Sequence, residues 1–311
     1  MKKKAKSKSV LKKKPKKKIK SVRILGLDLS GAKNQKTTLA LMEYYPDQEK
    51  VFLLDLIDQA FEDSNDSRKQ KKNQNPDEQL VQTIRHFAKG SDHLGVSVPL
   101  SLPPCIPCRI KNCPFPKKCT VPQVRWMRES VKKAKKNDLS EKHITPKEFT
   151  PYTQRPIELW MRYFLFPQLP ENLRFEIDET LGGTRAPLSA RMIFLKKHLK
   201  SFKLYEVLPK LTLALVCKEL SIPHRFLSDY RDVERGVYAR KQILEYLVQK
   251  KGVFIYQKDL SHCSKSLNSF NAFLCAYTAF LEVTKKTQPR PKNFPKSAHW
   301  LSYPKMVQNN G

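Results

Sequence analysis

The chain has no long apolar run. No stretch approaches the eighteen or so consecutive apolar residues that a helix needs to span a bilayer, which excludes an ordinary transmembrane helix. A short apolar segment follows the basic start, but Asp28 interrupts it after a few residues, and the segment alternates as a strand does. The sequence therefore predicts a cytoplasmic protein without a signal peptide.

Acidic residues are scarce. There are 29 Asp and Glu residues against 60 Lys and Arg residues, which gives a formal net charge of +31. Twelve of the first twenty residues are lysines and none is acidic, so +19 remains on the rest of the chain. This excess predicts a polyanionic partner, and nucleic acid is the obvious one. For residues 1–20 alone, expected to form a disordered lysine-rich tail, an anionic membrane surface or a purely solubilising role is an open alternative.

Several catalytic patterns are missing. The seven histidines show neither metal-ligand spacing nor a triad arrangement, and no serine has a plausible base nearby in sequence, so nothing supports a serine hydrolase. The segment Gly26–Gly31 has the G-x-D-x-S-G form found in actin-like and sugar kinases. Those enzymes need a second glycine-rich phosphate loop, and the one candidate, Gly182-Gly183-Thr184, is more typical of a turn.

Four cysteines, in contrast, stand within fifteen residues: Cys105, Cys108, Cys113 and Cys119. Thiolates spaced C-x2-C-x4-C-x5-C suit one Zn²⁺ ion or an iron–sulfur cluster, and both remain open. Two disulfides would need an oxidising compartment, which nothing in the chain indicates. The pattern predicts a metal loop at residues 103–122 with a structural role, because a closed four-thiolate site has no open position for catalysis.

The apolar periodicity predicts an α/β fold with a mixed sheet flanked by helices. We expect one domain over residues 21–285, in which an insertion at about 100–202 carries the cysteine loop between the fourth and fifth strands, followed by a proline-rich tail at 286–311. The expected strands are Val22–Leu29, Thr37–Tyr45, Lys50–Ile57, His93–Val98 and Lys203–Val207. The expected helices follow Pro76 and Pro187 and cover Val124–Lys136, Ile157–Leu165, Pro209–Leu220, Val233–Lys250 and Leu267–Lys285.

Notable residues close three of these strands. In open α/β sheets, ligands gather at the carboxyl ends of the strands. Asp28 is the sharpest case, because a carboxylate inside an apolar strand loses solvation unless a metal ion or hydrogen bonds compensate it. Glu206 is a weaker case, since a strand end near solvent can carry a carboxylate without cost.

These segments resemble the conserved blocks of the domain-of-unknown-function family 429, whose members are predicted nucleases with an RNase H-like fold. The family's G-x-D, I-D-A-P-L and E-x-Y-P blocks are similar to Gly26–Gly31, Val96–Leu100 and Glu206–Pro209, and its late helix D-A-x-x-C-A-x-T-A is similar to Asn271–Ala279. The resemblance covers about residues 22–284. Some family members carry a similar cysteine-rich loop.

The resemblance implies phosphodiester hydrolysis with Mg²⁺ or Mn²⁺ held by three or four carboxylates. Asp28 and Glu206 keep the family's acids, whereas Ser97 and Asn271 replace its two other aspartates and remove two formal charges. Two hypotheses follow: a metal-dependent nuclease with a partly degenerate site, in which Asp259 or Glu282 could replace a lost carboxylate, or a catalytically lapsed domain that binds nucleic acid.

A basic helix follows the cysteine loop and is the expected contact surface for nucleic acid. Its alternative interpretation is a solvated helix face. The mixed aromatic and basic segments around Trp126 and Trp160 are more typical of a packed face than of base stacking. The expected contact residues are Lys33, Arg125, Arg128, Lys132, Lys133, Lys135 and Lys136.

Overall fold

The computed structural model describes residues 21–31, 37–58, 75–88, 92–136 and 149–306. The predicted lysine-rich tail at 1–20 and the predicted contact Lys33 lie outside these residues.

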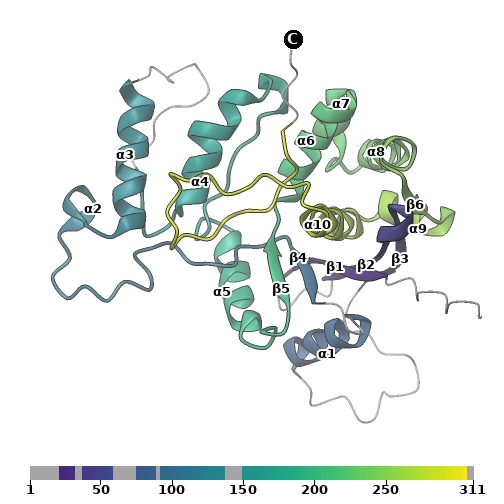
Figure 1. Ribbon diagram of the computed structural model, residues 1–311, viewed down its shortest axis with the longest axis horizontal. Helices are drawn as coiled ribbons and strands as arrows, with labels where there is room; N and C mark the ends of the chain where they lie inside the picture. Colours follow the sequence, from purple (N-terminus) through teal and green to yellow (C-terminus); the bar gives the residue numbers. More distant parts are fainter. Residues whose placement is uncertain (1–20, 32–36, 59–74, 89–91, 137–148, 307–311) are drawn as a thin grey trace, which may run out of the picture.

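The centre of the fold is a six-stranded mixed sheet in the order β5-β4-β1-β2-β3-β6 (Figure 1). β2 runs antiparallel to both of its neighbours, β1 and β3, while β4 and β5 run parallel to β1 and β6 runs parallel to β3. This confirms the predicted α/β class with a mixed sheet flanked by helices. The strands are Val22–Asp28, Thr38–Tyr45, Lys50–Ile57, His93–Val96, Lys203–Glu206 and Val253–Ile255 for β1 to β6. The three-residue β6 was not predicted from the sequence.

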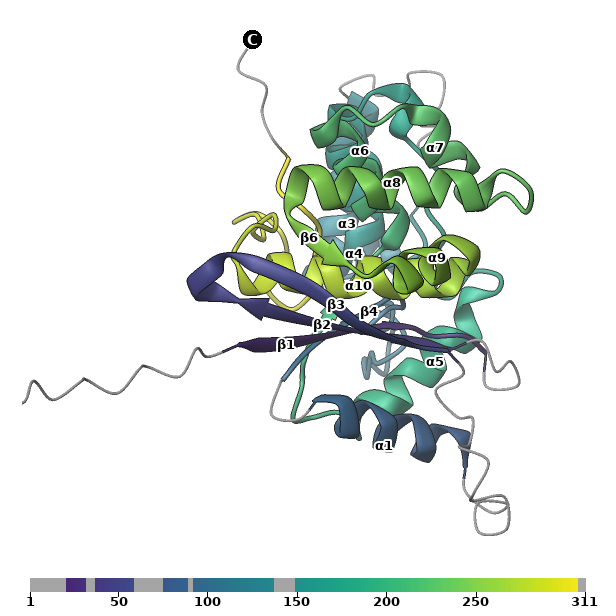
Figure 2. The ribbon, with the colours of Figure 1, turned by 90° about the vertical axis from the view of Figure 1, so that its right-hand side faces the viewer.

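Helices cover both faces of the sheet (Figure 2). One face packs against α1 and α5, whose buried residues include Ile84 and Leu195. The other face packs against α10, and α6 and α8 complete that core. No helix within the described ranges is both long and apolar enough to cross a membrane. The longer helices are Pro76–Ala88 (α1), Pro122–Lys136 (α3), Arg185–Lys196 (α5), Pro209–Leu220 (α6), Gly236–Lys251 (α8), Gln257–Lys265 (α9) and Leu267–Val283 (α10). The shorter ones are Phe115–Lys118 (α2), Pro156–Trp160 (α4), which continues as a π-helical turn over Met161–Leu165, and His224–Asp229 (α7).

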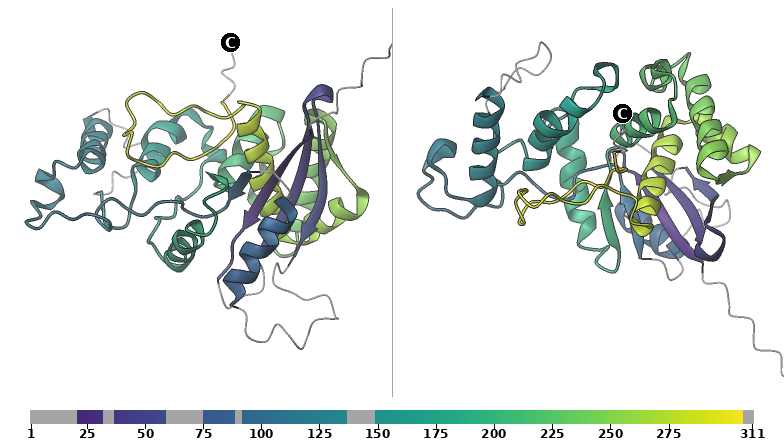
Figure 3. Two further views of the ribbon diagram at one scale, coloured as in Figure 1. Left: turned by 60° about the horizontal axis from the view of Figure 1, so that its bottom comes forward. Right: turned by 45° about the horizontal axis from the view of Figure 1, so that its top comes forward.

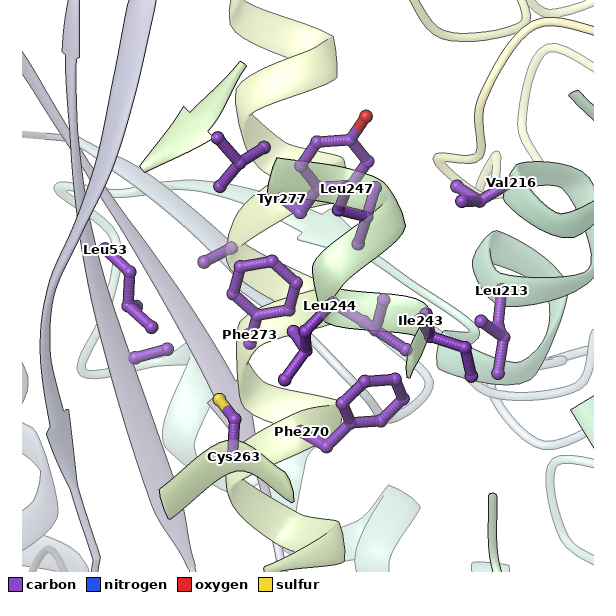
Figure 4. Close-up of a cluster of buried hydrophobic side chains, with 14 of the residues drawn as sticks. Leu53, Leu213, Val216, Ile243, Leu244, Leu247, Cys263, Phe270, Phe273 and Tyr277 are labelled. Carbon is purple, nitrogen blue, oxygen red and sulfur yellow. The ribbon is translucent and has the colours of Figure 1, made fainter. Parts of the chain in front are cut away.

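α10 lies directly on two glycines of the sheet. Gly26 of β1 is the register partner of Gly95 of β4, so the two form a shallow groove without side chains. A Cβ at Gly26 would lie 2.2 Å from the Ala272 carbonyl oxygen, and one at Gly95 would lie 2.2 Å from that of Cys275. α10 meets the groove with small residues, and its larger side chains Phe273 and Tyr277 belong to the core shared with α8 (Figure 4).

The proline-rich C-terminal segment is part of the folded body, which corrects the expected tail at 286–311. Residues 287–306 run from α10 towards α4 (yellow in Figure 3), and Phe294 and Tyr303 are buried there against residues of α4 and α6. Trp126 and Trp160 both contact the Phe294 ring edge-on, at centroid distances of 5.2 and 6.0 Å, so these aromatic side chains pack as a core. A bridge from Ser302 to Val207 attaches the segment to the end of β5, and a bridge from Pro304 to Thr287 joins the two ends of the segment.

The glycine groove gives the first prediction. Gly26→Ala places a methyl group against the α10 backbone, and backbone cannot move aside as a flexible side chain can, so we expect a loss of about 3 kcal/mol or more in the free energy of unfolding. Gly31→Ala is the matched control: a Cβ there meets nothing within 4 Å, and the change is expected to stay within about 0.5 kcal/mol. Urea denaturation of both variants makes the comparison. Equal stability of the two would contradict the close approach of α10.

Candidate functional site

Three of the four predicted catalytic residues meet where β1 and β4 end and α10 begins. Asp28 is the last residue of β1, and Ser97 follows β4 directly. The Ser97 hydroxyl and the Asn271 amide both hydrogen-bond to the Asp28 carboxylate, with 3.4 Å from Asn271 Nδ2 to Asp28 Oδ2. The Ser97 hydroxyl oxygen also accepts from the Leu29 amide, which fixes the loop after β1. The resemblance thus identifies residues that share one site.

The Asp28 carboxylate is poorly compensated. Burial raises its pKa to about 6, and the opposing effects of the Ser97 and Asn271 hydrogen bonds and of the more distant Arg231 charge are smaller. The side-chain amide oxygen of Asn271, Oδ1, is buried and has no hydrogen-bond partner among the described residues. An uncompensated carboxylate beside an unsatisfied amide oxygen costs stability and is typical of a site kept for function.

A second carboxylate, Asp58, lies at the same edge and was not predicted. It follows β3 directly and accepts hydrogen bonds from Thr38 (2.9 Å), Ser269 (2.8 Å) and His262. Burial raises its pKa, but these hydrogen bonds and the His262 charge outweigh burial, so the net pKa is lowered. The sequence held a signal: two successive antiparallel turns return the end of β3 to the end of β1.

The two carboxylates belong to one cluster, which we call the carboxylate edge: Asp28, Asp58, Ser97, Ser269 and Asn271. Thr38 connects its halves, because it is the register partner of Asp28 and donates to Asp58. Ser269 and Asn271 come from the first turns of α10, where the Ser266 hydroxyl caps the Ser269 amide. The positive end of the α10 dipole therefore faces two acidic side chains, which is the favourable orientation.

Glu206, the fourth predicted catalytic residue, lies on the opposite face of the sheet. It is in register with Val96, which is in register with Leu27, so all three side chains point to the face covered by α1 and α5. Asp28 is one residue beyond Leu27 and points to the α10 face. The expectation that Asp28 and Glu206 share a site is therefore wrong.

Glu206 instead belongs to a buried ion pair. Arg155 Nη1 and Nη2 donate to its two carboxylate oxygens at 2.8 and 2.6 Å, and the Leu100 amide donates at 2.8 Å. Burial raises the pKa of Glu206, but the Arg155 charge and these hydrogen bonds outweigh it and hold the pKa at about 2. Arg155 also contacts the buried Glu158 at 2.9 Å, so one guanidinium serves two carboxylates.

The donor set of the carboxylate edge does not fit a two-metal centre. Such a centre takes three or four carboxylates, and this edge offers two, both already engaged in hydrogen bonds. Within the described ranges, no group of three or more His, Cys, Asp or Glu residues is arranged to hold a metal ion. Glu282, a suggested replacement, accepts from Ser302 at the far end of α10. Asp259 is buried in α9, and one of its carboxylate oxygens has no partner among the described residues.

The cysteine loop precedes α3 and stays a prediction as a metal site. Burial, followed by proximity to the Cys119, Cys108 and Cys113 thiols, raises the pKa of Cys105. Cys119 is buried, whereas Cys108 and Cys113 are exposed. Cys105 is therefore within electrostatic range of the other three thiols, and the described residues show no arrangement of ligands around a metal position.

The predicted basic surface lies on α3. Its exposed cations are Arg125, Lys132, Lys133, Lys135 and Lys136. Arg128 differs, because its guanidinium donates to the carbonyl oxygens of Pro116 and Cys119 at 2.9 and 3.0 Å. Arg128 therefore links the cysteine loop to α3, and its guanidinium is already engaged in hydrogen bonds, unlike the exposed cations expected to contact nucleic acid.

Comparison with protein-family models, with curated proteins and with solved structures found no match. The functional inference therefore comes from the residues of the site.

The raised pKa of Asp28 predicts a pH-dependent gain from Asp28→Asn. A raised pKa means that the folded state holds the proton more tightly, so stability from this group is present below about pH 4 and is lost as the pH rises through about 6. Asp28→Asn should raise the free energy of unfolding at pH 7 by about 1–3 kcal/mol and leave it nearly unchanged at pH 4. Urea titrations across this range test the prediction, and a difference that does not vary with pH would contradict it.

The buried pair predicts a large loss from Arg155→Gln. This change leaves Glu206 and Glu158 buried without their cation, so we expect a loss of about 3–5 kcal/mol in the free energy of unfolding. Arg125→Gln on the exposed face of α3 is the control, with an expected change within about 0.5 kcal/mol. Thermal and urea denaturation measure both. A small effect of Arg155→Gln would mean that the pair contributes little.

Proposed function

We propose that this protein binds nucleic acid through a basic surface on an RNase H-like domain whose acidic site has lost two-metal catalysis. The observation that carries the proposal is the composition of the carboxylate edge. Ser97 and Asn271 stand beside Asp28 where the family resemblance implies aspartates, and the remaining acid, Glu206, is turned to the other face and held by Arg155. Hard divalent cations need anionic oxygen donors, and this edge supplies too few for a pair of ions.

The mixed sheet supports the fold part of the proposal. β1–β3 form an antiparallel unit, β4 and β5 extend it parallel to β1, and the residues of the family's blocks close β1 and β4 and begin α10. Asp28, Ser97 and Asn271 come from three distant segments, and the Ser97 and Asn271 side chains both hydrogen-bond to Asp28. If the resemblance were due to chance, there would be no reason for residues from three separate motifs to lie in one site.

The charge of the chain after its first twenty residues supports nucleic acid as the partner. Beyond the first twenty residues the chain keeps a formal charge of +19. Four exposed lysines, Lys132, Lys133, Lys135 and Lys136, lie within two turns of α3. Lysines at this density neutralise backbone phosphates, and the counterions thus released strengthen binding at low salt.

A metal-dependent nuclease is the second candidate, and Asp58 favours it. Asp28 and Asp58 both lie at the carboxylate edge, joined by Thr38, so a single divalent ion would find two carboxylates there. Asp28 and Asp58 both belong to the carboxylate edge, so a metal ion bound by these two acids would not need Glu206 as a ligand.

Cleavage assays separate the two candidates. Plasmid, single-stranded DNA and RNA are incubated with Mn²⁺ and the full-length wild type, Asp28→Asn, or the Ser97→Asp/Asn271→Asp double variant. The proposal expects no cleavage by wild type, whereas cleavage by the double variant alone would mark a site that has lapsed. Wild-type cleavage that Asp28→Asn abolishes would establish the nuclease instead.

Binding is tested by fluorescence anisotropy over a range of salt concentrations. The variant with Lys132, Lys133, Lys135 and Lys136 changed to Gln should lose affinity and reduce the slope of log K against log salt by up to about 3 on single strands. The matched control changes four exposed lysines elsewhere, Lys197, Lys200, Lys250 and Lys258, to Gln. Equal effects of the two sets would show binding by net charge alone and contradict a surface on α3.

A further inference from the structure

A small cavity lies where the chain passes from β5 into α6. Its volume is about 240 Å³, and it contains three cationic side chains, Arg185, Lys210 and Arg231, drawn from the start of α5, the start of α6 and the segment after α7. The other residues that line it are Phe175, Glu176, Ile177, Asp178 and Leu208.

Positive charge is in excess in this cavity. Asp178 lies 3.9 Å from Arg185, and the exposed Glu176 is the second acid. Neither Lys210 nor Arg231 forms an ion pair with any carboxylate of the described residues. Burial and then repulsion from Arg231 lower the pKa of Lys210, and attraction by Asp178 and Glu176 does not cancel them. Lys210 and Arg231 repel each other across this cavity, and a bound anion would offset that repulsion.

The form of the cavity limits what the anion can be. Drug-sized ligands occupy pockets of about 300–1,000 Å³, so a volume of 240 Å³ suits one compact group rather than a whole nucleotide. Arginine forks and a lysine ammonium are the donors that bind phosphate. The Lys210 ammonium already lies 4.9 Å above the centre of the Phe175 ring, which orients it within the cavity.

The cavity is also electrically connected to the carboxylate edge. Arg231 acts on Lys210 within the cavity and on Asp28 at the edge, so the guanidinium lies within electrostatic range of both. The neighbouring Tyr230 interacts with Asp28 as well. A phosphate in the cavity would therefore lie within electrostatic range of the site to which the family resemblance points.

We propose that the cavity formed by Arg185, Lys210 and Arg231 binds one phosphate group, and that a nucleic acid supplies it. The second part rests on the proposed function; the first does not. The bound phosphate anchors the strand at the end of β5, and Arg231 holds the adjoining backbone near Asp28. The positive end of the α6 dipole adds to the attraction, since Lys210 belongs to the first turn of that helix.

The first experiment uses inorganic phosphate and the full-length protein in isothermal titration calorimetry. Wild type should bind one phosphate saturably, and Lys210→Gln/Arg231→Gln should weaken the binding by about tenfold or more, because two charge-assisted contacts are lost. Lys250→Gln, at the exposed C-terminal end of α8, is the control and should bind as wild type. Thermal unfolding of each variant checks that the fold is retained.

Two results overturn the cavity site. One is the absence of saturable phosphate binding to wild type. The other is equal binding by wild type and the double variant, which would place the anion elsewhere, such as among the surface lysines.

The second experiment tests nucleic acid as the source. Anisotropy titrations with a single-stranded oligonucleotide should show that Lys210→Gln/Arg231→Gln reduces the salt slope by at least about 0.7, the share of one phosphate contact on a single strand, while Lys250→Gln does not. If inorganic phosphate binds the cavity but the oligonucleotide titration is unchanged by the double variant, the phosphate site stands and its nucleic-acid source is wrong. If wild type binds inorganic phosphate but no oligonucleotide, the proposed function fails while the cavity site survives.

Discussion

The contact between α10 and two neighbouring glycines determines the arrangement of the whole molecule. Because Gly26 and Gly95 present no side chains, the helix backbone rests on the sheet, and the small residues Ala272, Cys275 and Ala276 fill the remaining space. This close approach sets the height at which α10 begins, and so brings Ser269 to Asp58 and Asn271 to Asp28. A helix standing further from the sheet would leave both carboxylates without their hydrogen-bond donors. The same close packing therefore determines both the core under α10 and the positions of the hydrogen-bond donors at the carboxylate edge.

The sequence was sufficient for the fold class and for part of the site. Alternation within the strands located β1 to β5, and the order of short motifs placed Asp28, Ser97 and Asn271 together. The error at Glu206 has a definite origin: side chains alternate across a strand, so a motif can locate a residue at the end of a strand without fixing its face. Glu206 is in register with Val96, whose side chain points away from Asp28. Had Glu206 stood one residue later, opposite Ser97, its side chain would have pointed to the Asp28 face. Asp58 was missed because it follows its strand without a motif.

The pKa values of Glu206 and Asp28, on opposite faces of the sheet, are shifted in opposite directions. On the α1 and α5 face, Glu206 is matched by a bidentate guanidinium, and its pKa is held at about 2. On the α10 face, Asp28 receives two weak donors, and its pKa rises to about 6. The first arrangement attaches the N-terminus of α4 to β5, because Arg155 is the residue before that helix. The second leaves an acid without an ion-pair partner among the described residues, within electrostatic range of Arg231.

The sequence distance spanned by α10 has a consequence for biosynthesis. Asp28 and Asn271 are 243 residues apart, and the segment that buries Tyr303 emerges later still. While the ribosome is still translating, the face of β1 and β2 that α10 covers is already made but lacks that helix. Long-range closure of this kind is slow and leaves the nascent chain exposed to aggregation until α10 has been made.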